Sequence, residues 1–353
     1  MRILVTGGAG YIGSHTVVEL LGRGDDVAIV DSLVNADVAV LDRIERIAGR
    51  RPDFHHADVR DREALDALLE VGLSGGSFDA AIHFAGLKAV GDSVQDPLGY
   101  WNANVHGAQV LLDALNRHGV HRFVFSSTAM VYAPEAAQPL REDSPIRPAN
   151  PYGQTKLAIE QMLQALAAAD DRWRVSILRY FNPVGAHPSG EIGEAPTGTP
   201  NNLMPYLAQV AVGRRERLRV FGDDYDTPDG TGVRDYVHVV DLARGHLAAL
   251  EALERHPGCR VHNLGTGRGT SVLEMIHTFA RTNDLDVPYT ITDRRAGDVP
   301  TLCAAVDLAS SELNWTAHLD LEAMCRDTWN WQRRNPEGYG TPPPAAASAL
   351  RRP

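Results

Sequence analysis

The chain has 353 residues, of which 44% are hydrophobic and 22% charged, the balance of an ordinary globular protein with room for two domains. Its formal net charge of −11 argues against general nucleic-acid binding, which needs a basic surface. The sequence contains neither an apolar run of membrane-spanning length nor a signal peptide, so we expect a cytoplasmic protein without membrane contact.

The first half of the sequence alternates short apolar segments with helical ones. Strands are predicted at 2–6, 27–31, 53–56, 79–84, 122–127 and 174–180, with helices between them, for example at 10–23 and 100–116. This alternation predicts a parallel sheet covered by helices on both faces, with ligands at the carboxyl ends of the strands. Past Phe181 the alternation gives way to loops rich in glycine and proline, which indicates a smaller, mixed α/β substrate-binding domain. We expect one domain at 1–182 joined by part of 231–265, a second at 183–340, and a disordered tail at 341–353.

The first predicted strand runs directly into a glycine-rich turn. Gly7, Gly8, Gly10 and Gly13 follow it as the chain enters a helix. Glycines there allow a tight turn and let backbone N–H groups approach a pyrophosphate closely. Asp31 ends the next strand, where a carboxylate hydrogen-bonds ribose hydroxyls and repels a 2′-phosphate. This order predicts a Rossmann-type doubly wound domain that binds NAD rather than NADP, against the alternative of a merely structural glycine turn.

A second signal is the four-residue step from Tyr152 to Lys156. On a helix this step places both side chains on one face, about 5–6 Å apart at Cβ. A free tyrosine has a pKa of about 10 and is a poor base at neutral pH, but a neighbouring ammonium can lower that pKa by roughly 1–3 units. The pair follows a predicted strand that ends in Ser126, Ser127 and Thr128. We therefore expect Tyr152 to take a proton from a sugar hydroxyl while the dinucleotide accepts a hydride.

Other clusters of polar residues have simpler explanations. His55, His56 and the histidines at 118 and 121 lack zinc-binding spacing, and four aspartates between 223 and 229 resemble a calcium loop in density only, so no metal site is predicted. Cys259, Cys303 and Cys325 have neither disulfide nor zinc spacing. They are predicted to be packing residues in a reducing compartment.

Six motifs give the chain a resemblance to a known family. They are VTGGAGYIG at 5–13, HFAGLKAV at 83–90, YGQTK at 152–156, RYFNPVGAH at 179–187, NNLMPY at 201–206 and GVRDYVH at 232–238. The sequence resembles the UDP-glucose 4-epimerases, of the extended short-chain dehydrogenase/reductase superfamily, from Met1 to about Tyr339. The first and third motifs are typical of the superfamily, and the later ones are more specific to the epimerases.

The resemblance implies an isomerase of galactose and carbohydrate metabolism that interconverts UDP-glucose and UDP-galactose. Tyr152 would remove the proton from the hexose 4-hydroxyl while the C4 hydride passes to tightly held NAD. The 4-keto sugar would then turn over and take the hydride back on its other face, so that the cycle is redox-neutral. Lys156 would lower the tyrosine pKa and hold the nicotinamide ribose, and Thr128 would share a hydrogen bond with the sugar 4-oxygen.

The resemblance also assigns cofactor contacts, most of them at the ends of the predicted strands. The family has Asn and Ser at positions where this chain has Ser32 and Ala36, so these polar contacts differ. The implied NAD contacts are Gly7, Gly10, Tyr11, Ile12, Gly13, Asp31, Ser32, Asn35, Asp58, Val59, Phe84, Ala85, Gly86, Lys88, Asn104, Tyr152, Lys156 and Phe181.

For the nucleotide sugar, two arginines suit a diphosphate because a guanidinium binds phosphate oxygens in a bidentate fork. As bare sequence, Arg234 fits a surface or ion-paired arginine at least as well, and only its motif favours the site. Phe221 would stack on uracil. The family's gate beside the hexose falls at Leu302, where a bulky residue is associated with glucose and galactose and a small one admits N-acetyl sugars. Leucine, intermediate in volume, favours the non-acetylated pair. The implied substrate contacts are Thr128, Tyr152, Asn182, Asn202, Leu203, Phe221, Arg234, Tyr236, Arg295, Asp298 and Leu302.

Several alternatives stay open. The enzyme could be a 4-epimerase of UDP-N-acetylhexosamines or UDP-pentoses. A nucleotide-sugar 4,6-dehydratase would need Asp-Glu after the threonine, where this chain has Ala129 and Met130. A non-catalytic NAD sensor would be expected to lose the Tyr152–Lys156 pair. In the family, helices equivalent to 100–116 and 153–167 pair across a two-fold axis, which implies a homodimer.

Overall fold

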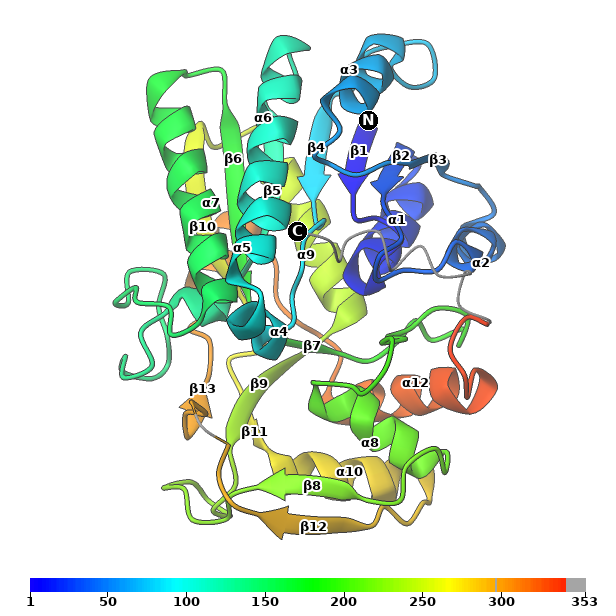
Figure 1. The fold of residues 1–353 in the computed structure, drawn as a ribbon, viewed down its shortest axis with the longest axis vertical. Helices are drawn as coiled ribbons and strands as arrows, with labels where there is room; N and C mark the ends of the chain where they lie inside the picture. Colours follow the sequence, from blue (N-terminus) through cyan, green and yellow to red (C-terminus); the bar gives the residue numbers. More distant parts are fainter. Residues whose placement is uncertain (296, 341–353) are drawn as a thin grey trace.

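A seven-stranded parallel sheet forms the larger part of the molecule. The computed structural model describes residues 1–295 and 297–340. All neighbouring strands of this sheet are parallel (Figure 1). The strand order is β10 (Gly258–Leu264), β6 (Arg174–Tyr180), β5 (Arg122–Thr128), β4 (Ala80–His83), β1 (Arg2–Thr6), β2 (Asp26–Asp31) and β3 (Asp53–His56).

Successive strand residues serve opposite faces of the sheet, because side chains alternate along a strand. Ile3 and Val5 belong to one hydrophobic core, whereas Leu4 between them belongs to the other. The first core is covered by α1 (Tyr11–Arg23), α2 (Ala39–Ala48), α9 (Val239–Ala252) and α11 (Asp307–Leu313). The second is covered by α3 (Arg62–Val71), α6 (Gly107–Arg117) and α7 (Pro151–Ala169). Near-continuous apolar strands are what burial on both faces requires, and the predicted doubly wound fold is confirmed.

The helix predicted at 100–116 is not a continuous α-helix. Its first part is a π-helical turn, η1 (Trp101–His106), which follows α4 (Val90–Gln95) and α5 (Pro97–Tyr100), and α6 begins only after this turn. Such turns carry about one extra residue per turn and often occur at functional sites. A short 3₁₀ turn, η2 (Ala129–Val131), follows β5.

The second domain is built around a small mixed sheet below the first (Figure 1). In it β9 (Val233–His238) pairs in parallel with β7 (Asn182–Val184) and β13 (Thr301–Leu302), and antiparallel with β11 (Gly269–Ser271). A separate parallel pair joins β8 (Leu218–Phe221) to β12 (Tyr289–Thr292). The helices α8 (Leu203–Ala211), α10 (Val272–Asn283) and α12 (Leu321–Arg334) enclose its hydrophobic core.

The chain returns to the first sheet through α9 and β10. Where the domains separate remains a prediction, and the tail at 341–353 lies outside the described residues. Within the described residues, no helix is long and apolar enough to cross a membrane.

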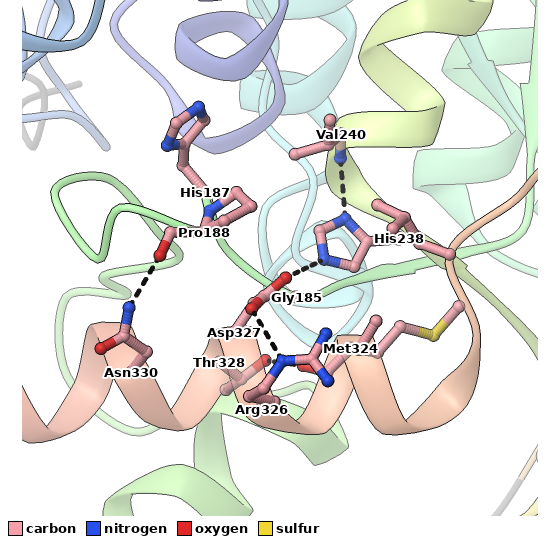
Figure 2. A network of polar contacts seen from close by, with 12 residues as sticks. Gly185, His187, Pro188, His238, Val240, Met324, Arg326, Asp327, Thr328 and Asn330 are labelled. Atoms are coloured by element: carbon pink, nitrogen blue, oxygen red, sulfur yellow. Dashed lines mark hydrogen bonds and ion pairs between the residues drawn. The ribbon is translucent and has the colours of Figure 1, made fainter.

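A buried polar network joins the segment after β7 to α12. At the end of β9, His238 lies within 3.2 Å of the Asp327 carboxylate, and its other ring nitrogen accepts the Val240 N–H (Figure 2). Gly185 has φ of +94°, and a Cβ there would lie 2.8 Å from the His238 ring. Only glycine fits this position, and the Gly185 carbonyl in turn accepts a hydrogen bond from the Tyr11 hydroxyl at 2.7 Å. The network therefore fixes the second domain against the start of α1.

Candidate active site

The carboxyl ends of β1 and β4 meet at the glycine turn. Gly7 has φ of +72°, and a Cβ there would lie 2.5 Å from the backbone nitrogen of Ala85. At Gly13 a Cβ would lie 2.2 Å from the Gly7 carbonyl oxygen, so α1 packs directly on the turn. Helix α1 begins at Tyr11 with no side chain capping its N-terminus. Its first N–H groups and its dipole are therefore suited to an anion.

Asp31 stabilises this turn as well as facing the site. Its carboxylate accepts the N–H of Ala9 at 3.0 Å and of Leu33 at 2.9 Å. Leu33 has φ of +57°, a conformation that costs a branched residue free energy and often marks a ligand loop. Ser32 and Asn35 lie on this same loop, next to the end of β2.

The loop after β4 is held in place by Asn104 from the π-helical turn. The side chain of Asn104 accepts the Leu87 N–H at 2.8 Å and donates to the Leu87 carbonyl and to Thr155. Phe84 and Ala85 donate backbone N–H groups to the Thr6 carbonyl, and a Cβ at Gly86 would lie 3.0 Å from the Asn104 side chain. Residues 84–88 are thereby fixed between the glycine turn and α7.

Tyr152 stands in the first turn of α7, which begins at Pro151. The side-chain oxygen of Asn150 accepts the Gly153 N–H at 2.9 Å and so caps the helix. Together with proline at the first helical position, this cap favours a helix start here. One turn later Lys156 is 5% exposed, and its ammonium donates to the Ser126 carbonyl at 2.8 Å. Thr128 is buried at the end of β5. Helix α7 therefore brings Tyr152 and Lys156 to the end of β5, as the four-residue spacing predicts.

The expected lowering of the tyrosine pKa is not seen in this structure. Tyr152 as a whole is partly exposed, but its phenol group is buried, and burial raises the pKa of Tyr152 to about 12 against the opposing hydrogen bond with Thr128. Burial also lowers the pKa of Lys156 to about 8, against the opposing charge of Glu160. The physical reason is that the Lys156 ammonium is directed to the Ser126 carbonyl, while desolvation acts on both groups.

Beneath this pair lies a buried ion pair that the sequence analysis missed. Glu160 and Arg179 are 1% and 4% exposed, and their closest atoms are 2.6 Å apart. Glu160 also accepts the Ser127 hydroxyl. The four-residue step from Tyr152 to Lys156 continues to Glu160, and this continuation could have identified it.

Other predicted residues line the segment that crosses to the second domain. Phe181 is buried, and Asn182 follows it on β7 with a buried side-chain oxygen that has no partner within the described residues. Such an orphaned acceptor is suited to a ligand. Asn202 is the N-cap residue of α8, directly before Leu203, yet its side chain does not cap the helix.

The two predicted arginines lie beside different partners. Arg234 approaches Asp298 to 4.0 Å and donates to the Val299 carbonyl at 2.9 Å. Arg295 lies over the ring of Phe221, 4.6 Å from its centre. Arg295 therefore covers one face of the Phe221 ring in a cation–π contact.

Four predicted contacts have a partly structural environment. Tyr236 is 5% exposed and packs in the core of the second domain, so it supports β9 rather than lining an open surface. Asp58 is engaged by Arg60 at 2.6 Å, and Val59 is buried against α6 and α3. Leu302 pairs with Arg234 across β13 and β9 and packs near Phe181.

The glycine turn and uncapped helix at β1, the buried acid at β2 and the Tyr152–Lys156 pair at β5 fit a dinucleotide and a hydride-transfer reaction. Together they define an NAD-binding α/β enzyme of the dehydrogenase type. The family model "NAD dependent epimerase/dehydratase family" matches residues 3–265. The chain belongs to the NAD dependent epimerase/dehydratase family.

Similar proteins narrow the resemblance. A UDP-glucose 4-epimerase of Bacillus subtilis is 53% identical over 339 residues, covering 96% of this chain and 99% of the relative. The crystal structure of a UDP-glucose 4-epimerase from Stenotrophomonas maltophila with NAD and formylated UDP-arabinopyranose has a TM-score of 0.91 at 51% identity, covering 95% of this chain and 98% of that one. That of the Bifidobacterium longum enzyme with NAD⁺ and UDP has a TM-score of 0.91 at 46% identity, covering 96% and 100%. The predicted resemblance to the UDP-glucose 4-epimerases is confirmed.

Proposed function

We propose that this chain is an NAD-dependent UDP-sugar 4-epimerase that interconverts UDP-glucose and UDP-galactose. The observation that carries the proposal is the meeting of Thr128, Tyr152 and Lys156 at one strand end, in a sheet whose neighbouring strand ends form the glycine turn. The relatives named UDP-glucose 4-epimerase extend over 96% of the chain, so the substrate domain shares the likeness.

In this proposal Tyr152 exchanges a proton with the sugar 4-hydroxyl. Bound NAD would supply the hydride acceptor and donor. A phenol with a pKa of about 12 is almost entirely protonated at neutral pH, so the Lys156 ammonium and the charge of the filled site must stabilise the phenolate. Thr128, beside the phenol, holds the 4-oxygen in line for that exchange. Return of the hydride to the opposite face of the 4-keto sugar inverts C4.

The remaining predicted contacts are assigned by position. Gly7, Gly10, Tyr11, Ile12 and Gly13 would hold the pyrophosphate. The loop from Asp31 to Asn35 and the residues Asp58 and Val59 would hold the adenosine, with residues 84–88 and Asn104 along the nicotinamide half.

For the nucleotide sugar, the proposed contacts come from both domains. Asn182, Asn202, Leu203, Arg234, Arg295 and Asp298 would bind the diphosphate and uridine, with Phe221 under the uracil and Leu302 beside the hexose. A UDP-pentose is the second candidate substrate, because the similar Stenotrophomonas maltophila structure holds a formylated UDP-arabinopyranose.

A homodimer and a cytoplasmic location belong to the same proposal. Val94, Leu98 and Trp101 are 63%, 81% and 40% exposed on α4, α5 and η1, next to α7. An apolar surface of this kind fits a second copy of the chain. Light scattering coupled to size-exclusion chromatography should return twice the chain mass, and a monomer would contradict the dimer.

The direct test offers the purified protein UDP-galactose, UDP-N-acetylgalactosamine and UDP-xylose separately, without added reductant. We expect UDP-glucose as the main product of the first reaction, resolved by chromatography. Conversion of none of the three would overturn the proposed function, and a preference for UDP-xylose or the acetylated sugar would change its substrate.

A further inference from the structure

Glu194 lies where the two domains meet at the site, and it is none of the residues assigned above. Its carboxylate oxygen Oε1 accepts hydrogen bonds from the Lys88 ammonium at 3.1 Å and from the Asn202 side-chain amide at 3.3 Å. Lys88 belongs to the first domain, in the loop after β4, and Asn202 to the second, at the start of α8. One oxygen atom therefore connects a proposed cofactor contact to a proposed sugar-nucleotide contact.

The Glu194 backbone is anchored independently of these two partners. Its carbonyl accepts the indole N–H of Trp331 at 3.3 Å, and a Cβ at neighbouring Gly193 would lie 2.4 Å from the Trp331 ring. The Glu194 side chain is only 11% exposed, and with Tyr11 and Gly185 it lines one small cavity. The backbone that carries this carboxylate is therefore fixed, and the carboxylate lies near Tyr11, the first residue of α1.

A carboxylate at this place is unfavourable for the site unless it has a specific task. The pyrophosphate of NAD and the diphosphate of a UDP-sugar are both anions, and a nearby unpaired negative charge would repel them. The pairing with Lys88 removes that cost. It also restrains the Lys88 side chain, which is 56% exposed and without this restraint would lose rotamer entropy on binding a ligand.

The use of lysine in this chain supports a specific task for the Lys88 ammonium. Lys88 and Lys156 are the only lysines in the sequence, and all its other lysine-or-arginine positions are arginines. Both lie near the loop after β4: Lys88 is in this loop, and a Cβ at Gly86 of the same loop would lie 3.9 Å from the Lys156 ammonium. A compact ammonium and a guanidinium fork bind differently, so lysine at these two positions, in a chain that has arginine at all its others, points to a task that needs the ammonium.

We propose that Glu194 is a positioning residue, which holds Lys88 and Asn202 across the domain boundary in the geometry that receives NAD and the UDP-sugar. It acts through these two side chains and takes no part in proton or hydride transfer. The inference rests on the proposed function, because it assigns the sugar nucleotide to the Asn202 side.

The inference predicts a split between binding and chemistry. Glu194→Ala should release NAD faster and raise KM for UDP-galactose, each by about threefold to tenfold, the range expected for the net contribution of one ordinary hydrogen bond. The value of kcat per bound NAD should change less than twofold. Glu194→Asp keeps the charge and should recover part of the loss. The matched control is Glu191→Ala, three residues before Glu194, which removes a surface ion pair with Arg46. It should leave NAD release and KM unchanged.

Double-mutant cycles test whether Glu194 acts through its partners. In a Lys88→Met background, Glu194→Ala should leave the rate of NAD loss unchanged or lower it, because it then removes an unpaired carboxylate near the anionic ligands. The NAD absorbance of the protein after gel filtration measures this rate. In an Asn202→Ala background it should add little to KM. Because the chain has two lysines, ¹³C-lysine labelling also reports Lys88 directly, and its side-chain signal should show faster motion in Glu194→Ala.

The outcomes separate the two claims. Additive effects in both cycles, or an unchanged Lys88 signal, would overturn the positioning role. A fall in melting temperature with unchanged KM and unchanged NAD release would do the same. An inactive wild-type protein that still loses NAD faster as Glu194→Ala would overturn the proposed function and leave the Lys88 half of the inference standing.

Discussion

Replacing Lys156 with methionine should stabilise the protein while removing its activity. Lys156 is 5% exposed, and its ammonium lies 4.9 Å from the centre of the Phe125 ring and donates to the Ser126 carbonyl. Burial lowers the pKa of this lysine from 10.5 to about 8, with Glu160 opposing the shift. Methionine has a similar length and suits the apolar surroundings.

The magnitude and the sign follow from that pKa. Each unit is worth about 1.36 kcal/mol, so the charged lysine costs the folded state about 3 kcal/mol at neutral pH. The folded pKa lies below the unfolded one, and between the two the unfolded chain binds more protons than the native one. The penalty is therefore complete below about pH 8 and is relieved as the pH rises towards 10.5. The advantage of Lys156→Met should shrink by about 2 kcal/mol between about pH 7 and pH 9.5.

Two measurements check this reasoning. Urea unfolding of both proteins at several pH values gives the difference in free energy of unfolding, and other titrating groups cancel in that difference. Labelling with ¹³C-lysine gives one signal for each of the two lysines, and the signal absent from Lys156→Met should titrate near pH 8 in the NAD-free protein. A stability difference that stays constant with pH, or a midpoint near 10.5, would refute the assignment of a desolvated ammonium.

Three further predictions concern single residues. Tyr152→Phe should reduce kcat by at least about a hundredfold, the typical contribution of a general base, while NAD stays bound; turnover at the wild-type rate would contradict the proton-transfer role. Arg179→Met should lower the free energy of unfolding by about 3–5 kcal/mol, because it leaves the Glu160 carboxylate buried and uncompensated; chemical denaturation checks it, and a loss below about 1 kcal/mol would mean that water reaches the pair. Asp31→Ala should weaken discrimination against NADP and loosen the turn that it holds at Ala9 and Leu33; competition between NAD and NADP for the apoenzyme measures it, and unchanged discrimination would mean that another group senses the 2′ position.

The fold was predictable because its signals are local. Apart from the edge strand β3, whose residues Asp53–His56 are mostly polar, each strand of the large sheet in the first half of the chain is a short apolar run, and most predicted ends differ from the observed ones by no more than one residue. The glycines, Asp31 and the Tyr152–Lys156 step mark strand ends for steric and electrostatic reasons that act within a few residues. Asn104 was assigned only through the resemblance, and the π-helical turn that presents it was predicted as ordinary helix.

What the sequence did not reveal depends on contacts between distant segments. Glu160 and Arg179 meet across a helix and a strand, and Glu194 meets Lys88 across the domain boundary. The pKa of Tyr152 was expected to fall because its neighbour is a cation. In the folded chain desolvation outweighs the hydrogen bond with Thr128, and the cation is directed to the Ser126 carbonyl. Such a balance is set by burial and by hydrogen-bond direction, which spacing alone does not encode.

In these contacts the arginines and the lysines of the candidate site have different surroundings. Arginines of the second domain are placed near Asp298 and Phe221, where planar donors suit phosphate and base. Lys88 lies in the loop after β4 and pairs with Glu194, whereas Lys156 lies on α7 and is desolvated. A desolvated cation gains most when a neighbouring phenol ionises, because no solvent screens the pair. The raised pKa of Tyr152 and the lowered pKa of Lys156 are therefore two effects of the same dry environment.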